Sequence, residues 1–69
     1  MLSTKQEVSH ALKELKLGET KYVNRAEMNE IFDLSELNPV GIKAWLDNSG
    51  LTEFEPKESM NGDWTFHRL

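Results

Sequence analysis

The chain contains no cysteine, so neither a disulfide bond nor a thiolate metal site can stabilise it. Its 69 residues make a single domain, residues 1–69, in which apolar burial barely exceeds the entropy cost of ordering the chain. A core must therefore be built from apolar side chains alone. Six large rings are available for it: Tyr22, Phe32, Trp45, Phe54, Trp64 and Phe66.

Long apolar runs are also missing, since no stretch approaches the roughly 18 residues that a membrane span needs. The first residues, Met-Leu-Ser-Thr-Lys-Gln-Glu, become polar at the third position, which is not the pattern of a secretory signal peptide. A chain without cysteine also agrees with a reducing compartment. We therefore expect a soluble, cytoplasmic protein that makes no membrane contact.

A basic excess is absent as well. Twelve acidic residues face eight basic ones, which gives a net charge of −4. Residues 35–69 hold six acids and three bases, whereas residues 1–34 hold six acids and five bases. Proteins that bind duplex nucleic acid usually concentrate lysine and arginine where they meet phosphate. The more acidic C-terminal half argues against such a surface in that part of the chain.

Catalytic and metal-binding patterns are likewise lacking. The two histidines, His10 and His67, stand in no ligand spacing with each other. No glycine-rich loop is present to hold a phosphate. Glu53 and Glu55 share one face of a predicted strand, but a solvated strand face explains them more simply than an acid–base pair. We expect no enzymatic activity, no cofactor and no metal.

The N-terminal segment predicts a first helix. Ser3 can cap it, with Gln6 completing a capping box. Thr4 and Glu7 offer the same pairing one residue later. Gly18 stands where a left-handed helix C-cap is expected. The apolar face of this helix has helical spacing and consists of Val8, Ala11, Leu12 and Leu15.

A second helix is predicted after a short β-prone stretch, residues 21–23. Asn24 is a good N-cap, and Glu27 three residues later can complete a capping box. A turn follows the helix, and we expect Leu34 and Leu37 to point inward from it. The apolar stripe of the second helix is Met28, Ile31 and Phe32.

A third helix opens with Asn38 as its cap and Pro39 at its first position, and Gly50 ends it. Gly41 inside this helix costs up to about 1 kcal/mol relative to alanine. Close approach of a partner would explain the glycine, and so would clearance against the second helix or simple tolerance near a helix start. The inward stripe of the third helix is Ile42, Trp45 and Leu46.

The remaining residues predict a β-hairpin with strands at residues 51–55 and 63–69. A two-residue Asn-Gly turn would place Phe54 on the opposite face from Trp64. A longer loop lets these two rings pair, and Pro56 favours it because proline cannot donate to a strand ladder. We therefore predict the longer loop.

The order of helix, short strand, helix, turn, helix and hairpin resembles the winged helix-turn-helix superfamily. Many members close the third helix with leucine, three variable residues, glycine and leucine, here Leu46, Gly50 and Leu51. The resemblance covers most of residues 3–69. It implies a three-helix winged helix-turn-helix domain of the α+β class with a C-terminal β-hairpin wing. The third helix is then the recognition helix, and residues 56–62 form the tip of the wing.

The outward face of the third helix departs from that of DNA-binding members, because it carries no arginine. Helical spacing turns five side chains to this face: Val40, Lys43, Ala44, Asp47 and Asn48. Val40 and Ala44 form either a docking patch or an internal contact with the turn at Leu37. The hairpin adds more acids than bases, with Glu53, Glu55, Glu58 and Asp63 against Lys57 and Arg68.

Two binding functions follow from these features. The first is a regulatory module whose third helix and acidic wing dock on a protein of the transcription or nucleic-acid machinery. Its expected contact residues are Val40, Lys43, Ala44, Asp47, Asn48, Glu53, Glu55, Lys57 and Glu58. The alternative is a DNA-binding regulator acting as a homodimer. It would use Lys43 and Asn48 on base edges and Lys57 or Arg68 on phosphate. Charge favours the protein partner, and the resemblance favours duplex DNA.

Overall fold

Three helices and a three-stranded antiparallel sheet make up the fold in the computed structural model, which describes residues 2–69. Along the chain the elements are α1 (Lys5–Lys13), β1 (Thr20–Val23), α2 (Arg25–Ile31), α3 (Pro39–Asn48), β2 (Phe54–Glu58) and β3 (Trp64–Arg68). This order confirms the predicted α+β class, the C-terminal hairpin and the short strand between the first two helices.

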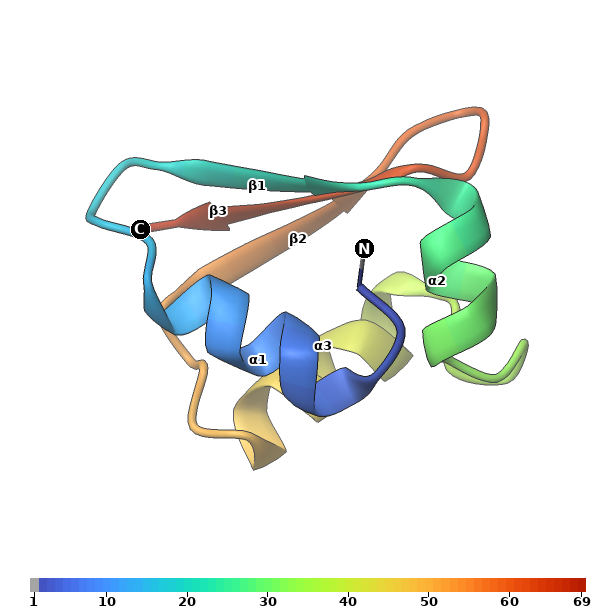
Figure 1. Ribbon diagram of the computed structural model, residues 1–69, viewed down its shortest axis with the longest axis horizontal. Coiled ribbons are helices and arrows are strands. Elements are labelled where there is room, and N and C mark those ends of the chain that lie inside the picture. Colours follow the sequence, from blue (N-terminus) through green and yellow to red (C-terminus); the bar gives the residue numbers. More distant parts are fainter. Residues whose placement is uncertain (1) are drawn as a thin grey trace.

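The sheet has β3 in its middle, between β1 and β2. All three helices cover one face of this sheet, and its other face is open (Figure 1). Side chains alternate along a strand, so Trp64 and Phe66 of β3 point toward the helices and are buried. Thr65 and His67 point to the open face instead. The helices therefore pack on one hydrophobic surface.

A single cluster of buried side chains, drawn from every element, forms the core. Trp45 packs against its edge and meets Phe32 edge-to-face, with the ring centroids 5.1 Å apart. Tyr22 does not join the other rings, because it lies on the open face of the sheet and is 56% exposed. The buried residues are Val8, Leu12, Val23, Met28, Phe32, Ile42, Leu46, Leu51, Phe54, Trp64 and Phe66.

The first helix begins at the second of its two candidate caps. The Thr4 hydroxyl, not that of Ser3, accepts the Glu7 backbone N–H at 3.2 Å. The prediction that Gly18 caps this helix is wrong, because α1 already ends with Glu14 as its C-cap. Gly18 has a positive φ of 84° and donates its N–H to a carbonyl of the C-terminal strand at 2.9 Å. It therefore serves the turn into β1.

The second helix forms as predicted, and the turn after it only in part. Asn24 and Glu27 make the reciprocal capping box. Leu37 is half-buried, as expected. Leu34 is 86% exposed, so the prediction that it points inward is wrong. Backbone hydrogen bonds of 2.9 and 3.3 Å close residues 33–37 into a tight turn, whose tip carries Leu34 into solvent.

The third helix lies close against that turn. Asn38 caps the helix by accepting the Gly41 N–H at 2.8 Å, and Pro39 is its first residue. A β-carbon added to Gly41 would lie 2.6 Å from the backbone oxygen of Glu36. The glycine therefore provides clearance within the chain, against the turn that follows the second helix.

The chain reverses direction directly after α3. Gly50 has a positive φ of 74°, and the Leu51 N–H reaches back to the Leu46 carbonyl at 2.8 Å. Leu51 is buried beside Leu46 in the core. Leu46 and Leu51 thus anchor the turn in the core, and Gly50 ends the third helix as the sequence predicts.

The hairpin differs from the prediction in its register. β2 covers residues 54–58 rather than 51–55, and Pro56 lies inside the strand instead of the loop. Phe54 pairs with Arg68, and Trp64 pairs with Glu58, so the expected pairing of the two rings is wrong. The loop spans residues 59–63 between the two strands, which confirms a connection longer than two residues. Phe54 and Trp64 still share the buried face.

Replacing Gly41 by alanine should destabilise the protein, although alanine is normally the better helix former. The added methyl group meets backbone, which cannot move aside as a flexible side chain can. We expect a loss of about 1–3 kcal/mol in the free energy of unfolding, measured by urea denaturation. The control Asn48→Ala, at an exposed position of the same helix, should stay within about 0.5 kcal/mol. A Gly41→Ala variant as stable as the parent would contradict the close contact.

Candidate partner-docking surface

The outward face of α3 is exposed along most of its length. Val40 is 79% exposed, Ala44 and Asp47 are also exposed, and Lys43 is half-buried. Val40 and Ala44 therefore form a surface patch and do not pack inside at Leu37. A shallow depression of about 430 Å³ lies over this face. Its lining consists of Pro39, Val40, Lys43, Ala44 and Asp47.

A second depression, of about 310 Å³, continues from the first between α3 and β2. The two share Pro39 and Lys43, and we call them together the α3–β2 groove. Leu69, 61% exposed, adds an apolar side chain on the side of the hairpin. The lining of the second depression is Pro39, Lys43, Phe54, Glu55, Pro56 and Leu69. Sequence reasoning missed Pro39, Pro56 and Leu69, because only the hairpin register brings β2 beside the start of α3.

Lys43 lies across this groove and is engaged on both sides. Its ammonium group donates to the Phe54 carbonyl at 3.4 Å and lies 3.5 Å from an Asp47 carboxylate oxygen. Asp47 thereby balances the charge of Lys43 within α3, and the Lys43 side chain extends toward β2. A base-reading role for Lys43 would require both contacts to break.

Arg68 is held still more firmly. Its guanidinium donates to the Leu15 carbonyl, pairs with Glu53 at 3.3 Å and lies 5.8 Å from the centroid of the Phe54 ring. Its side chain is only 25% exposed. Arg68 therefore joins the end of β3 to the segment that follows α1 and to the start of the hairpin, rather than extending toward a phosphate.

Asp63, one of the acids counted in the hairpin, also serves the fold. Its carboxylate accepts the Arg25 backbone N–H at 2.7 Å, which ties the hairpin loop to the start of α2. The Tyr22 hydroxyl and the Arg25 N–H both stabilise the ionised form, and they lower the pKa of Asp63 below its usual value. The hydrogen bond between the Tyr22 hydroxyl and Asp63 also raises the pKa of Tyr22.

The remaining residues of the predicted site do not all come together. Lys57 lies opposite Thr65 on the open face of the sheet, and Glu58 lies beside the hairpin loop. Both line a separate depression of about 370 Å³ that also contains Tyr22. Asn48 is exposed at the end of α3, outside the groove. Within the groove, Glu55 is the one charged side chain with no ion pair to the part of the chain that the structure describes.

The free edge of β2, which borders the groove, is protected against strand addition. The Ser59 N–H donates to the Asp63 carbonyl at 2.8 Å, and in an antiparallel pair such bonds alternate along the strand. Phe54, Pro56 and Glu58 therefore direct their backbone groups outward. Proline lacks the N–H, and Lys43 occupies the Phe54 carbonyl. A partner at this groove would therefore contact side chains rather than form backbone hydrogen bonds with the edge of β2.

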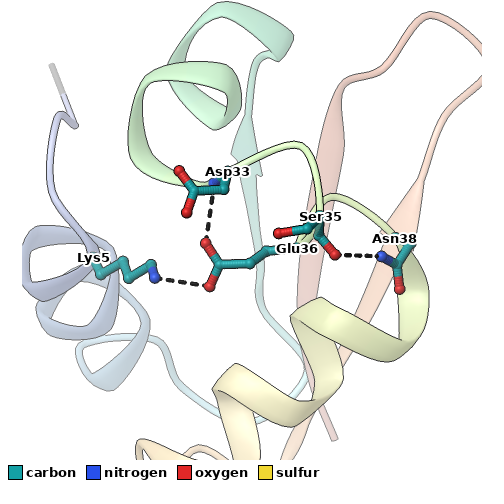
Figure 2. A network of polar contacts seen from close by, with 5 residues as sticks. All are labelled: Lys5, Asp33, Ser35, Glu36 and Asn38. Atoms are coloured by element: carbon teal, nitrogen blue, oxygen red, sulfur yellow. Dashed lines mark hydrogen bonds and ion pairs between the residues drawn. The ribbon is translucent and has the colours of Figure 1, made fainter.

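A polar network holds the turn that positions α3 (Figure 2). One Glu36 carboxylate oxygen accepts from the Lys5 ammonium group at 2.8 Å, and the other accepts the Asp33 backbone N–H at 3.0 Å. Asn38 donates to the Ser35 carbonyl at 3.0 Å. Gly41 packs against the backbone of Glu36, so the network links α1 to the turn on which the start of α3 rests.

Comparison with models of protein families, with curated proteins and with solved structures gave no match. Among residues 2–69, no three histidine, aspartate or glutamate side chains gather closely enough to hold a metal ion. Of the helices in this part of the chain, none combines the length and the apolar character of a membrane span.

The Glu36 network predicts a specific contribution to acid stability. The Lys5 ammonium and the Asp33 N–H lower the pKa of Glu36 below its ordinary value of 4.5. Because the pKa of Glu36 is lower in the folded state than in the unfolded state, the ionised carboxylate stabilises the fold. This stabilisation is complete above the ordinary pKa of 4.5 and is lost as the pH falls through the folded-state pKa. Glu36→Gln should therefore lose less unfolding free energy than the parent between about pH 5 and pH 3, as followed by urea denaturation.

The control is Glu30→Gln, at an exposed glutamate of α2 that makes no polar contact within residues 2–69. It should follow the pH dependence of the parent protein. An equally steep loss in Glu36→Gln and in the parent would show that this network does not contribute.

Proposed function

We propose that the chain is a small, cytoplasmic, non-enzymatic module of the winged helix-turn-helix type that acts by docking on another protein. The α3–β2 groove is the docking surface. The partner offers the basic surface with which a protein of the transcription or nucleic-acid machinery contacts phosphate. Binding of the module would then compete with nucleic acid.

The observation that carries the proposal is the engagement of two cations on this side of the molecule. Lys43 is bound to Asp47 and β2, and Arg68 is bound to Glu53 and to the Leu15 carbonyl. Phosphate contacts dominate affinity for duplex, so a surface without free cations is poorly suited to it. Within the groove Lys43 and Asp47 pair with each other, so Glu55 leaves one negative charge there that is unpaired within residues 2–69.

The lining of the groove specifies the chemistry of the partner. Val40, Ala44 and Leu69 offer apolar contact, whereas Glu55 and Asp47 offer carboxylates at the rim. An arginine or lysine beside an aliphatic or aromatic side chain would satisfy both. Apolar contacts contribute most of the affinity at such a centre, and rim charges contribute specificity and association rate.

The duplex-binding alternative is supported by the order of elements and by the signature at the end of α3. It requires Lys43 and Arg68 to exchange their internal partners for phosphate or bases. Lys57 is the only cation of its predicted set without an ion pair within residues 2–69. We therefore favour the protein partner.

A photo-crosslinking residue at position 44, introduced in the full chain, should capture the partner from a native lysate. Added duplex DNA should abolish capture in a concentration-dependent manner, because both compete for one basic surface. A captured protein that DNA does not displace would contradict the proposed partner chemistry, and so would direct capture of the DNA itself.

Substitutions in the groove should weaken the purified complex. We expect Val40→Lys and Glu55→Lys each to raise the Kd of the complex by about tenfold, because each substitution places a cation against a basic partner. The matched controls are Leu34→Lys and Glu30→Lys, at exposed positions outside the groove. They should change the Kd by less than about twofold, measured by isothermal titration calorimetry. An equal effect of the paired substitutions would place the interface elsewhere.

A further inference from the structure

The other edge of the sheet, β1, carries backbone groups without a partner. The Arg68 N–H donates to the Glu19 carbonyl at 2.9 Å. Hydrogen bonding in an antiparallel pair alternates, so Lys21 and Val23 are the next residues whose backbone groups face β3. Thr20 and Tyr22 therefore turn their N–H and C=O groups outward. Within residues 2–69, no other strand lies along this edge.

This edge lacks the protection found at β2. It contains no proline, and no lysine side chain occupies its outward carbonyls in residues 2–69. Thr20 and Tyr22 are both exposed. β1 is short, with four residues, and it contains Lys21. Its outward backbone groups are nevertheless uncovered by residues 2–69, and an uncovered edge is a template on which an extended chain can pair.

Beside β1 the acidic side chains contact their own chain and the lysines do not, within residues 2–69, whereas at the α3–β2 groove Lys43 is the side chain that is engaged. The neighbouring acids are turned to the chain itself. Glu14 pairs with His10 at 3.0 Å, Glu19 accepts the Lys16 N–H at 2.7 Å, and Glu27 accepts the Leu2 N–H at 3.0 Å.

The lysines beside β1 make no comparable contact with the part of their own chain that the structure describes. Lys13, Lys16 and Lys21 make no ion pair with residues 2–69. They lie at the end of α1, in the turn that leads into β1, and in β1 itself. The acids keep their charge, but their carboxylates are directed to their own chain, whereas these three ammonium groups remain available to a partner.

Self-pairing of this edge is disfavoured by the same charges. An antiparallel pairing of two β1 strands that satisfies the outward groups of both Thr20 and Tyr22 places Lys21 directly opposite Lys21 of the second copy. Like charges directly opposite each other in neighbouring strands are destabilising. A carboxylate at that position would be attracted instead.

We propose that the edge of β1 binds an acidic extended segment of a partner protein, which adds to the sheet as a fourth strand. Backbone hydrogen bonds from Thr20 and Tyr22 hold the segment, and glutamate or aspartate side chains face Lys21 and Lys16. This surface is separate from the α3–β2 groove, so the inference does not depend on the proposed function.

The test uses the full chain and a blocked heptapeptide that alternates threonine and glutamate. Nuclear magnetic resonance should show that the amides of Thr20 and Tyr22 gain protection from hydrogen exchange as the peptide is added. The amides of Lys21 and Val23 are already paired with β3 and should change little. A peptide that alternates threonine and lysine should bind at least about fivefold more weakly at low salt.

A matched pair of variants separates the effect of the Lys21 charge on peptide binding from the effect of the net charge of the protein. Lys21→Gln and Asn29→Asp each lower the net charge by one unit. Lys21→Gln should weaken acidic-peptide binding about threefold, and Asn29→Asp, on the exposed face of α2, should not. The same peptide with alternate residues N-methylated should not bind, because its backbone cannot pair.

Three results would overturn the proposal. The lysine peptide could bind as well as the glutamate peptide. The new protection could appear at Phe54 or Glu58 rather than on β1. The Thr20 and Tyr22 amides could become protected without peptide as the protein concentration rises, which would make a second copy the occupant.

Discussion

Gly50 adopts a positive φ of 74° and lets the Leu51 N–H bond back to the Leu46 carbonyl at 2.8 Å, so the chain turns back on itself directly after α3. The geometry of the hairpin depends on this reversal. It places β2 alongside α3 and brings Phe54 into the core. Because the chain has no cysteine, no disulfide bond can hold this turn, and a chain of this length relies on that burial.

The reversal also determines which charges remain free. Once β2 lies along α3, Lys43 reaches the Phe54 carbonyl, and the end of β3 brings Arg68 to Glu53 and to the Leu15 carbonyl. The side of the molecule that the resemblance assigns to recognition thus uses these cations internally. Near β1 the opposite happens, because Glu14, Glu19 and Glu27 bind groups of their own chain. Ammonium groups that remain available to a partner consequently lie near β1 rather than along α3.

Much of the fold could be predicted from local signals. Asn24 and Asn38 cap their helices and Gly50 ends the last one, because each of these roles depends on a few neighbouring residues. The hairpin register could not be predicted in the same way. The sequence pattern predicts Pro56 in the loop, but β2 tolerates it because its missing N–H would face the free edge.

The candidate site was predictable only in outline. Helical spacing was sufficient to find the exposed face of α3, including Val40 and Ala44. It is compatible with the pairing of Lys43 and Asp47, four residues apart, but it could not show that Lys43 reaches Phe54 or that Arg68 reaches Leu15, since these partners are distant in sequence. Leu69 joined the groove for the same reason. The sequence allows three explanations for the glycine at position 41. The Glu36 carbonyl beside Gly41 shows that clearance within the chain is the one that applies.

The central claim is that the cations of the α3–β2 side are held within the fold and leave no surface for duplex. Fluorescence anisotropy of a labelled 30-base-pair duplex, titrated with the full chain across a salt series, tests it most directly. At about 150 mM salt we predict no saturable binding, and Lys43→Ala should bind no more weakly than the parent. Submicromolar binding that weakens steeply with salt and is lost in Lys43→Ala would contradict the account.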